Sequence, residues 1–329
     1  MAMRIAVARG ALAVLDELAD RLRGEVDFVT GPADTPGEIA ELTAGADALV
    51  VTLHRLDDPC FAAMADSVRV VGRAGVGLDT IDLDAARAHG VAVVYQPAYA
   101  VGEVATHAVA MLLALQRRLS QSDAVVRGAG WGGGAEIGPI FSLGDASVAV
   151  LGCGRIGRAA VERLVPFVGE VRVFDPLVTE PIPGARLVAD LGELLDDADA
   201  LSLHVPLTPQ TRHIIGRREI RRMRQGALIV NVSRGGLIDE DELALALADG
   251  HLAGAGLDVF ETEPLPQSSP LRTAPNMLLS PHNAWNSTSA ARRLSEWTVA
   301  DVIAYIATHE VNHGRLAVEP AVRVTSVPE

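Results

Sequence analysis

Short apolar runs alternate with amphipathic stretches along the first hundred residues of the chain. Runs rich in Val, Ile and Ala predict buried strands, and longer stretches with helical periodicity predict helices. The expected strands are Arg4–Ala8, Ala48–Val51, Val68–Gly72 and Val91–Val94, the last being the final strand of this half. The expected helices are Ala11–Arg23, Asp57–Ala65 and Ile81–His89. This alternation is typical of a parallel α/β sheet.

A long helical stretch, Val101–Arg118, follows and is expected to cross between two domains. A glycine-rich loop is expected over 128–144, and Asp239 with Glu242 forms a capping-box-like start for a helix over Glu240–Ala248. The later strands are expected at Ala200–His204, Leu228–Asn231, Gly254–Asp258 and Met277–Ser280. The last elements are a helix over roughly Ser289–Thr308, which should return to the first domain, and a loosely ordered tail, Val318–Glu329.

The segment Ser147–Asp175 carries a complete dinucleotide-binding pattern of strand, glycine turn, helix, strand and acid. Gly152 permits a tight turn, Gly154 allows a pyrophosphate to approach the backbone, and Gly157 allows helix and strand to pack closely. The pyrophosphate would then lie at the positive end of the following helix. Asp175 would accept hydrogen bonds from the ribose hydroxyls and repel a 2′-phosphate, so the pattern predicts NAD rather than NADP.

Composition narrows the classes of function. A chain of 329 residues that is 49% hydrophobic and 21% charged fits a compact α/β protein with two cores. A net charge of −14 argues against binding to nucleic-acid phosphates. All 28 basic residues are Arg, and the lack of Lys excludes a Schiff base, pyridoxal-phosphate attachment and a P-loop lysine.

The remaining compositional features favour a cytoplasmic protein. Cys60 and Cys153 fall in different expected domains, so we expect no disulfide and a reducing compartment. The N-terminus enters a strand without a signal-peptide layout, and the most apolar helix, Val104–Leu115, is too short to span a membrane. No metal site is expected, because metal-ligand spacing is lacking among His54, His107, His204 and His213.

Three charged or titratable residues directly follow expected strands: Arg234 in NVSRGG, Glu263 in DVFETEP and His282 in SPHNAW. Because carboxyl ends of parallel strands meet at one edge, all three should face the crevice that would hold the nicotinamide. A His can take the hydroxyl proton, a neighbouring carboxylate stabilises its protonated form, and an Arg binds a substrate carboxylate. Taken one at a time, these residues are interpreted as a surface arginine, a solvated turn glutamate and a packing histidine. The three together predict a catalytic site.

At these motifs the chain resembles the D-isomer-specific 2-hydroxyacid dehydrogenase family over nearly its whole length. The matching segments are RAGVGLDTID (73–82), HAVAMLLAL (107–115), VLGCGRIGR (150–158), LHVPLTPQTRHII (203–215), NVSRGGLID (231–239), GLDVFETEP (256–264) and SPHNA (280–284). The resemblance implies a Rossmann coenzyme domain (100–284) inserted into a flavodoxin-like substrate domain (1–99 plus 285–329), both doubly wound parallel sheets. It also implies a catalytic set of Arg234, Glu263 and His282, and a homodimer.

The resemblance further implies where ligands bind. Gly75, Val76 and Gly77 match the loop whose amides bind the substrate carboxylate, although an ordinary strand-to-helix turn is the alternative. Arg73 would add charge to the same pocket. PAYAVGEVATHA (97–108) and Trp285 are similar to the branch of C-terminal-binding-protein-type dehydrogenases, in which an aromatic at the Trp285 position lines the substrate pocket; a core or interface Trp is the alternative. The expected coenzyme contacts are Gly152, Gly154, Arg155, Ile156, Gly157, Asp175, His204, Val205, Pro206, Thr211, Asn231, Val232, Ser233, Asp258 and His282.

Some positions depart from the family pattern, namely Thr80, Thr106 and Asn283, and Asn283 puts the substrate fit in question. The substrate side-chain pocket is expected around His54, Tyr99 and Trp285. An arginine cluster at 217–224 is read as a solvated helix face rather than a nucleic-acid patch, because aromatic residues are not interleaved with it.

We therefore expect an NAD-dependent oxidoreductase that interconverts a 2-oxo acid and a D-2-hydroxy acid, without nucleic-acid or membrane partners. Two alternatives stay open. One is an NAD(H)-responsive regulatory or binding protein, since a fold does not by itself fix a function. The other is a dehydrogenase of a different small anion, such as phosphite or a phosphonate.

Overall fold

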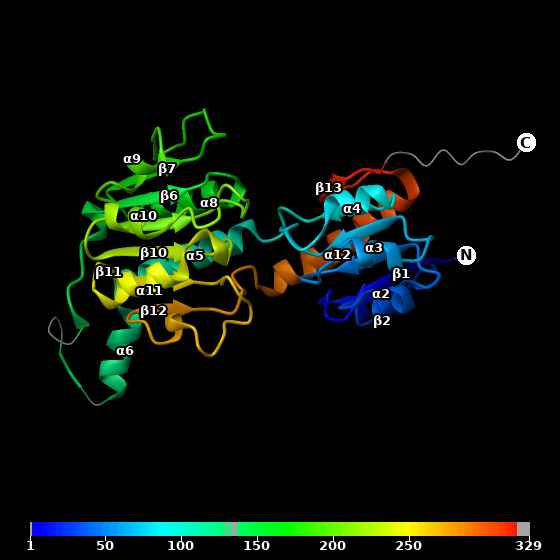
Figure 1. Ribbon diagram of the computed structural model, residues 1–329, viewed down its shortest axis with the longest axis horizontal. Coiled ribbons are helices and arrows are strands. Elements are labelled where there is room, and N and C mark those ends of the chain that lie inside the picture. Colours follow the sequence, from blue (N-terminus) through cyan, green and yellow to red (C-terminus); the bar gives the residue numbers. More distant parts are fainter. Residues whose placement is uncertain (1, 129, 133–136, 321–329) are drawn as a thin grey trace, which may run out of the picture. The chain divides into compact units, whose positions relative to one another are not determined.

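The computed structural model describes residues 2–128, 130–132 and 137–320 and divides the chain into two compact units (Figure 1). Unit 1 comprises residues 1–100 and 286–329, and unit 2 comprises residues 101–285. Each unit is an α/β sheet in which the strands run parallel, with one exception in unit 1. The expected α/β fold with two mostly parallel sheets is confirmed.

The sheet of unit 1 has the order β13-β5-β4-β3-β1-β2. Its five parallel strands follow the flavodoxin-like order 2-1-3-4-5, and β13 adds antiparallel to β5. The strands are β1 (Met3–Ala8), β2 (Val26–Gly31), β3 (Ala48–Val51), β4 (Val70–Arg73), β5 (Ala92–Tyr95) and β13 (Arg315–Val318). The helices are α1 (Leu15–Arg21), α2 (Pro36–Thr43), α3 (Asp58–Ala63), α4 (Leu83–Ala88) and α12 (Thr288–Thr308).

Three expectations for unit 1 are wrong. The sequence pattern did not predict β2 and α2, although Thr35 and Glu38 form a complete capping box at the start of α2. The first helix begins at Leu15 rather than Ala11, because residues 11–14 form a bend and a turn. Val91–Val94 is not the last strand, since β13 pairs with β5 and so takes Val318 out of the expected loose tail.

The sheet of unit 2 is entirely parallel, with the order β12-β11-β10-β9-β6-β7-β8. Read from β6 outward this is the doubly wound Rossmann order, and the strand order reverses between β6 and β9. The strands are β6 (Ser147–Leu151), β7 (Glu170–Phe174), β8 (Arg186–Leu187), β9 (Ala200–Leu203), β10 (Ala227–Asn231), β11 (Leu252–Leu257) and β12 (Met277–Leu279). The helices are α5 (Val101–Gln116), α6 (Leu119–Arg127), α8 (Arg155–Leu164), α9 (Leu191–Leu195), α10 (Arg217–Arg222) and α11 (Glu240–Ala248), with 3-10 turns at Leu143–Asp145, Gly235–Leu237 and Pro270–Arg272.

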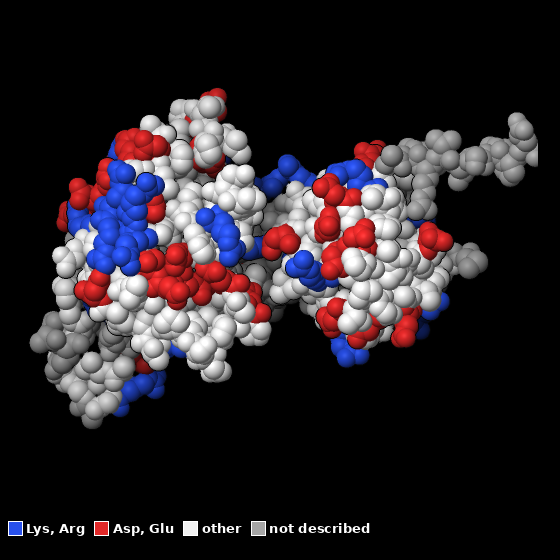
Figure 2. Space-filling view, in the orientation of Figure 1, with Lys and Arg blue, Asp and Glu red and all other residues white. Residues whose placement is uncertain are grey.

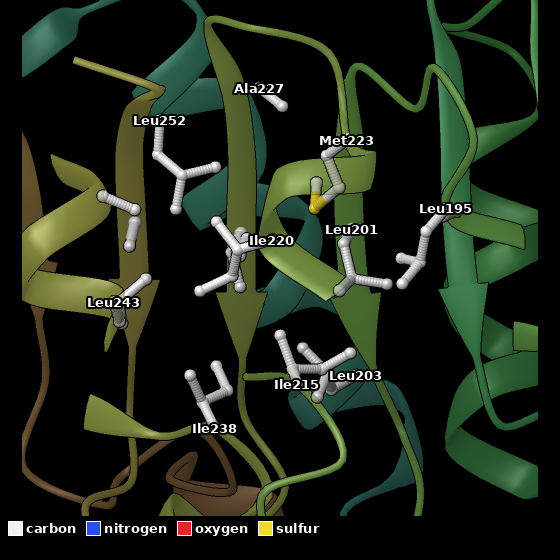
Figure 3. Packing of buried hydrophobic residues seen from close by; sticks show 14 of the residues in the cluster. Leu195, Leu201, Leu203, Ile215, Ile220, Met223, Ala227, Ile238, Leu243 and Leu252 are labelled. Atoms are coloured by element: carbon white, nitrogen blue, oxygen red, sulfur yellow. The ribbon is translucent and has the colours of Figure 1, made fainter. Parts of the chain in front are cut away.

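Helices cover both faces of this sheet, so its strands are buried on both sides. Along β6, Val148 and Val150 join the core under α5 and α8, whereas Ala149 and Leu151 join the core under α9, α10 and α11. Figure 3 shows the second core, in which Leu201 of β9 and Ile220 of α10 lie among fully buried aliphatic side chains. Burial on both faces explains why these strands read as continuous apolar runs.

The arginine cluster on and after α10 lies on the surface beside acidic side chains (Figure 2). Each arginine forms an ion pair, namely Arg217–Glu242, Arg218–Glu219, Arg221–Asp249, Arg222–Asp196 and Arg224–Asp199. The cluster is therefore an ion-paired helix surface rather than an unopposed positive patch. Within the described part of the chain, no helix is both long and apolar enough to cross a membrane.

Candidate active site

The glycine turn after β6 lies at the point where the strand order of unit 2 reverses. Gly152 has a φ of +90°, and a Cβ there would lie 2.7 Å from the carbonyl carbon of His204. A Cβ on Gly157 would overlap the carbonyl oxygen of Gly152. At Gly154, the N-cap of α8, a Cβ would meet nothing within 4 Å, and no side chain among the described residues caps the helix. The amides of the first turn of α8 therefore face open space.

Asp175 lies at the end of β7, beside this turn. Its Oδ2 accepts a hydrogen bond of 2.7 Å from the Cys153 amide, and its Oδ1 accepts one of 2.9 Å from the Leu177 amide. These two bonds fix the carboxylate next to the glycine turn. Cys153 is 1% exposed, and burial raises the pKa of its thiol, so it is a packing residue rather than a nucleophile.

His204 follows β9 on the opposite side of the reversal. Its Nε2 lies 2.8 Å from the Ser202 hydroxyl, and burial lowers the pKa of its imidazole to about 4. The ring is therefore neutral at physiological pH. An irregular segment and a turn follow, in which the Thr211 hydroxyl donates to the Pro206 carbonyl at 2.7 Å.

His282 and Glu263 form a hydrogen-bonded pair. His282 Nδ1 lies 2.7 Å from Glu263 Oε2, and the Phe260 amide donates to Glu263 Oε1 at 3.0 Å. Burial raises the pKa of the Glu263 carboxyl, but the contacts with His282, the Phe260 amide and the charge of Arg234 outweigh it, and the net pKa is lowered. Glu263 therefore stays ionised beside the imidazole. His282 has a φ of +52°, a left-handed conformation that is uncommon outside glycine and is found at functional sites.

A buried carboxylate holds the turn that carries His282. Asp258 is 1% exposed; its backbone carbonyl accepts from the His282 amide at 2.8 Å, and its Oδ2 accepts from the Ala284 amide at 2.8 Å. Its Oδ1 accepts from the Ser280 hydroxyl at 2.5 Å and from the Asn283 amide at 3.0 Å. Asp258, expected as a coenzyme contact, is thus already bound to this turn by four hydrogen bonds.

Two hydrogen bonds of this turn were not predicted from the sequence. The imidazole Nε2 of His107, on α5, lies 3.0 Å from the Ser280 hydroxyl and so extends the Asp258 network. Trp285 donates from its indole N–H to the His282 carbonyl at 3.2 Å. No spacing rule connects α5 with this turn, so the sequence held no signal for the His107 contact.

Arg234 lies in the turn that follows β10, and hydrogen bonds from neighbouring residues hold this turn. Asn231 donates from its side chain to the Arg234 carbonyl at 2.7 Å, and the Ser233 hydroxyl donates to the Leu203 carbonyl at 2.8 Å. The Arg234 guanidinium donates to the Ser233 carbonyl at 2.7 Å. Because β10, β11 and β12 are neighbours in the sheet, Arg234, Glu263 and His282 all lie beyond its carboxyl edge.

In unit 1, the candidate anion-binding loop follows β4. Arg73 is only 4% exposed, and its guanidinium donates to the carbonyls of Ala74 and, at 3.0 Å, Gly77. Within the described residues, no backbone acceptor binds the amides of Val76 and Gly77. Arg73 therefore binds two carbonyls of the loop, and its expected contribution of charge to the substrate pocket stays a prediction.

The other residues expected around the substrate differ in exposure. Tyr99 is 6% exposed, whereas Trp285 is partly exposed. His54 is also partly exposed; burial lowers the pKa of its imidazole, Asp34 opposes this shift and Arg73 adds to it. Of the residues that depart from the family pattern, Thr106 accepts a hydrogen bond from Arg163 at 3.1 Å. Thr80 Oγ1 and Asn283 Oδ1 are buried without a hydrogen-bond partner among the described residues.

Comparisons with known proteins agree with this arrangement. The family model described as the NAD binding domain of the D-isomer specific 2-hydroxyacid dehydrogenases matches residues 109–284. The D-3-phosphoglycerate dehydrogenase of Methanocaldococcus jannaschii is 38% identical over 322 residues, covering 97% of this chain and 58% of that protein. The glyoxylate reductase of Korarchaeum cryptofilum is 37% identical over 275 residues, covering 81% of this chain and 82% of that protein. The chain thus spans only 50–58% of the length of the phosphoglycerate dehydrogenases it matches.

Solved structures show the same fold. The TT0316 protein of Thermus thermophilus is 33% identical with a TM-score of 0.84, covering 95% of this chain and 99% of that one. A glyoxylate reductase from Paecilomyes thermophila is 26% identical with a TM-score of 0.84, covering 95% of this chain and 98% of that one.

Proposed function

The chain belongs to the D-isomer specific 2-hydroxyacid dehydrogenase family, and we propose that it interconverts a 2-oxo acid and a D-2-hydroxy acid with NAD(H). The observation that carries the proposal is the His282–Glu263 pair, held at 2.7 Å beyond the same sheet edge as Arg234. A histidine base can take the hydroxyl proton, a neighbouring carboxylate can stabilise the imidazolium, and an arginine can bind the anionic substrate.

Unit 2 has the features that NAD(H) requires. The turn Gly152–Gly157 leaves open space before the uncapped N-terminus of α8, where a pyrophosphate would accept amide hydrogens. Asp175 offers a fixed carboxylate for the ribose hydroxyls and would repel a 2′-phosphate. We include Arg155, Ile156, His204, Val205, Pro206, Thr211, Asn231, Val232 and Ser233 in the coenzyme site. NAD(H) held by these residues would supply the hydride acceptor or donor, its nicotinamide C4, for substrate C2.

We assign His282 as the general acid and base. In the oxidation direction, His282 Nε2 takes the hydroxyl proton of the 2-hydroxy acid while C2 loses a hydride, and the product is the 2-oxo acid. The imidazolium that forms is stabilised by the ionised Glu263 at Nδ1. In reduction the same proton returns to the alkoxide oxygen.

Arg234 and the loop Gly75–Val76–Gly77 are proposed to bind the substrate carboxylate and the reacting oxygen. The guanidinium supplies forked charged donors, and the loop supplies the amides of Val76 and Gly77. Arg73 donates to the Gly77 carbonyl of this loop and is proposed to add charge there. Trp285, whose indole N–H donates to the His282 carbonyl, is proposed to contact the substrate substituent.

The first test is NADH oxidation at 340 nm with a panel of 2-oxo acids that includes glyoxylate, pyruvate, hydroxypyruvate, 3-phosphohydroxypyruvate and phenylpyruvate. Turnover of one class with NADH preferred over NADPH is expected. NADH binding without turnover would favour a regulatory protein, and turnover of phosphite or a phosphonate alone would favour the other-anion alternative.

A variant separates proton transfer from binding. His282→Ala should lower kcat by about 10²- to 10⁴-fold while NADH still binds, as measured by fluorescence. His89→Ala, in unit 1 and paired with Asp58, is the matched control and should keep full activity. Full activity in His282→Ala would remove the proton-transfer assignment.

We also propose a cytoplasmic homodimer. The segment around α6 exposes several large apolar side chains, namely Leu119, Val126, Trp131 and Ile140. Such a group of exposed apolar residues is typical of a contact surface. Light scattering coupled to size exclusion should give twice the chain mass of 34.5 kDa, and Val126→Glu should lower the measured mass toward one chain.

A further inference from the structure

The loop that carries Glu263 contacts the rest of unit 2 at three places. The backbone of Phe260 lies so close to Gly235 that a Cβ added to Gly235 would overlap the Phe260 backbone. The Glu261 amide donates to the carboxylate of Glu240 at 2.6 Å. The Glu261 carboxylate lies 2.6 Å from His213 Nε2 and 3.5 Å from the Arg212 guanidinium.

Glu240 is an unusual acceptor in this set, because it does not serve its own helix. It is the first residue of α11, whose N-cap is Asp239, and Asp239 accepts the capping bond from the Glu242 amide. Burial raises the pKa of the Glu240 carboxyl; the Glu261 amide opposes this, while the charges of Glu261, Asp241 and Glu263 add to it. A partly buried carboxylate among three other acids costs stability. The contact that offsets this cost is the one with the Glu261 amide.

The helix behind Glu240 is a firm support. α11 packs on β11, with Leu243, Ala246 and Leu247 buried in the core. A loop bonded to the first residue of this helix is therefore tied to the rigid part of the sheet.

We propose that Glu240 is a positioning residue for the reaction, which sets the place of Glu263 through the Phe260–Glu261 backbone. The connection has three hydrogen bonds: the Glu261 amide donates to Glu240 Oε1, the Phe260 amide donates to Glu263 Oε1, and Glu263 Oε2 accepts from His282 Nδ1. The inference rests on the proposed function, in which Glu263 holds and stabilises the His282 imidazolium.

Removing the Glu240 acceptor should free the loop and weaken the Glu263–His282 contact. His282 would then lose part of the carboxylate contact that stabilises its protonated form. Substrate binding by Arg234 and by the Gly75–Gly77 loop involves other residues. The effect should therefore fall on kcat rather than on KM.

The experiment compares Glu240→Ala, Glu240→Gln and the matched control Asp241→Ala with the full-length wild type. Asp241 is the exposed neighbour on the same helix turn. Glu240→Ala should lower kcat about tenfold with KM changed less than twofold. The acid limb of the plot of kcat/KM against pH, measured for oxidation of the 2-hydroxy acid, should move to lower pH. Glu240→Gln keeps an acceptor oxygen and should restore most of the rate, and Asp241→Ala should behave as wild type.

A second readout does not depend on turnover. Hydrogen exchange follows the Phe260 amide, which donates to Glu263 Oε1 and should lose protection in Glu240→Ala but keep it in Asp241→Ala. If Glu240→Ala fails to fold, His213→Gln loosens Glu261 from its other side and should give the same fall in kcat and the same loss of Phe260 protection. A wild-type rate and wild-type Phe260 protection in Glu240→Ala, or a loss in Glu240→Gln equal to that in Glu240→Ala, would overturn the positioning role. Absence of turnover by the wild type would instead refute the proposed function, whereas unchanged Phe260 protection refutes this inference alone.

Discussion

The neutral His204 makes the stability of unit 2 depend on pH. Its pKa is about 4 in the folded protein against 6.5 when unperturbed, so the unfolded chain binds more protons between these values. Stability contributed by the neutral ring is complete above pH 6.5 and is lost as the pH falls toward 4. Lowering the pH from 7 to 5 should cost up to about 2 kcal/mol through this residue alone.

The measurement is the free energy of unfolding by urea at pH 7 and pH 5. His204→Gln cannot acquire the charge and should lose less stability over this interval than the wild type. His251, whose Nε2 lies 2.9 Å from the Ile220 carbonyl, provides the control substitution His251→Gln. Equal losses in wild type and His204→Gln would show that another group governs the acid sensitivity.

Gly235 tests how closely the Glu263 loop must approach β10. A Cβ at this position would lie on the backbone carbon of Phe260, which cannot move without carrying the loop with it. Gly235→Ala should therefore lower the free energy of unfolding by about 1–3 kcal/mol and reduce kcat. At Gly236 a Cβ would meet only side-chain atoms, at 3.2 Å from Arg212 and 3.3 Å from Leu207. Gly236→Ala is thus the control, and an equal effect at both positions would contradict this account.

At the scale of elements, the sequence predicted the strands that are buried on both faces and the edge strand β12, but it missed the edge strands β2, β8 and β13. β3 and β10 are buried at every residue and read as uninterrupted apolar runs. β2 is an edge strand in which Asp27 and Thr30 are exposed, so its pattern is broken. β13 is a four-residue edge strand whose pairing with β5 is set from a distance, by α12.

The side chain that sets this pairing is Asp301 of α12, which is fully buried. It accepts hydrogen bonds from the Gln96 side chain and from the amides of Asn312, His313 and Gly314 at 2.6–2.9 Å. Asp301→Ala leaves these donors without an acceptor and should lower the free energy of unfolding by about 3 kcal/mol or more. Asp301→Asn keeps one acceptor oxygen, so its free energy of unfolding should lie between those of the wild type and Asp301→Ala.

Hydrogen exchange locates the expected change. The amides of β13 and of the 312–314 turn should lose protection in Asp301→Ala, whereas β6 in unit 2 should keep it. Thr308→Ala, at the exposed end of the same helix, is the control. Uniform loss of protection in both units would mean that Asp301 does not act through β13.

At the scale of the whole molecule, topology made the candidate site predictable in part. Arg234, Glu263 and His282 could be placed at one edge because each follows a parallel strand, and β10, β11 and β12 are neighbours. The supports of that site could not be predicted. The contacts of His107 with Ser280 and of Glu240 with Glu261 join elements distant in sequence, and they depend on side-chain directions that no local pattern encodes.

The chain path also predicts how the two units behave when separated. Unit 2 is one continuous segment, 101–285, with a complete parallel sheet and a helical layer on each face. Unit 1 draws β13 and α12 from the C-terminal segment, and without α12 the β4 residue Gly72 would lose its packing against Val302 and Thr298. A fragment of residues 101–285 should therefore fold alone, whereas residues 1–100 should not.

Circular dichroism and urea titration of the two fragments test this expectation. The 101–285 fragment should unfold cooperatively and bind NADH without turning over a 2-oxo acid, because it lacks the loop Gly75–Gly77 that is proposed to bind the substrate carboxylate. Residues 1–100 should become ordered only when 286–329 is joined to them through a short linker. A folded 1–100 fragment would show that β13 and α12 are dispensable, and an unfolded 101–285 fragment would show that its two helical layers do not suffice to stabilise the sheet.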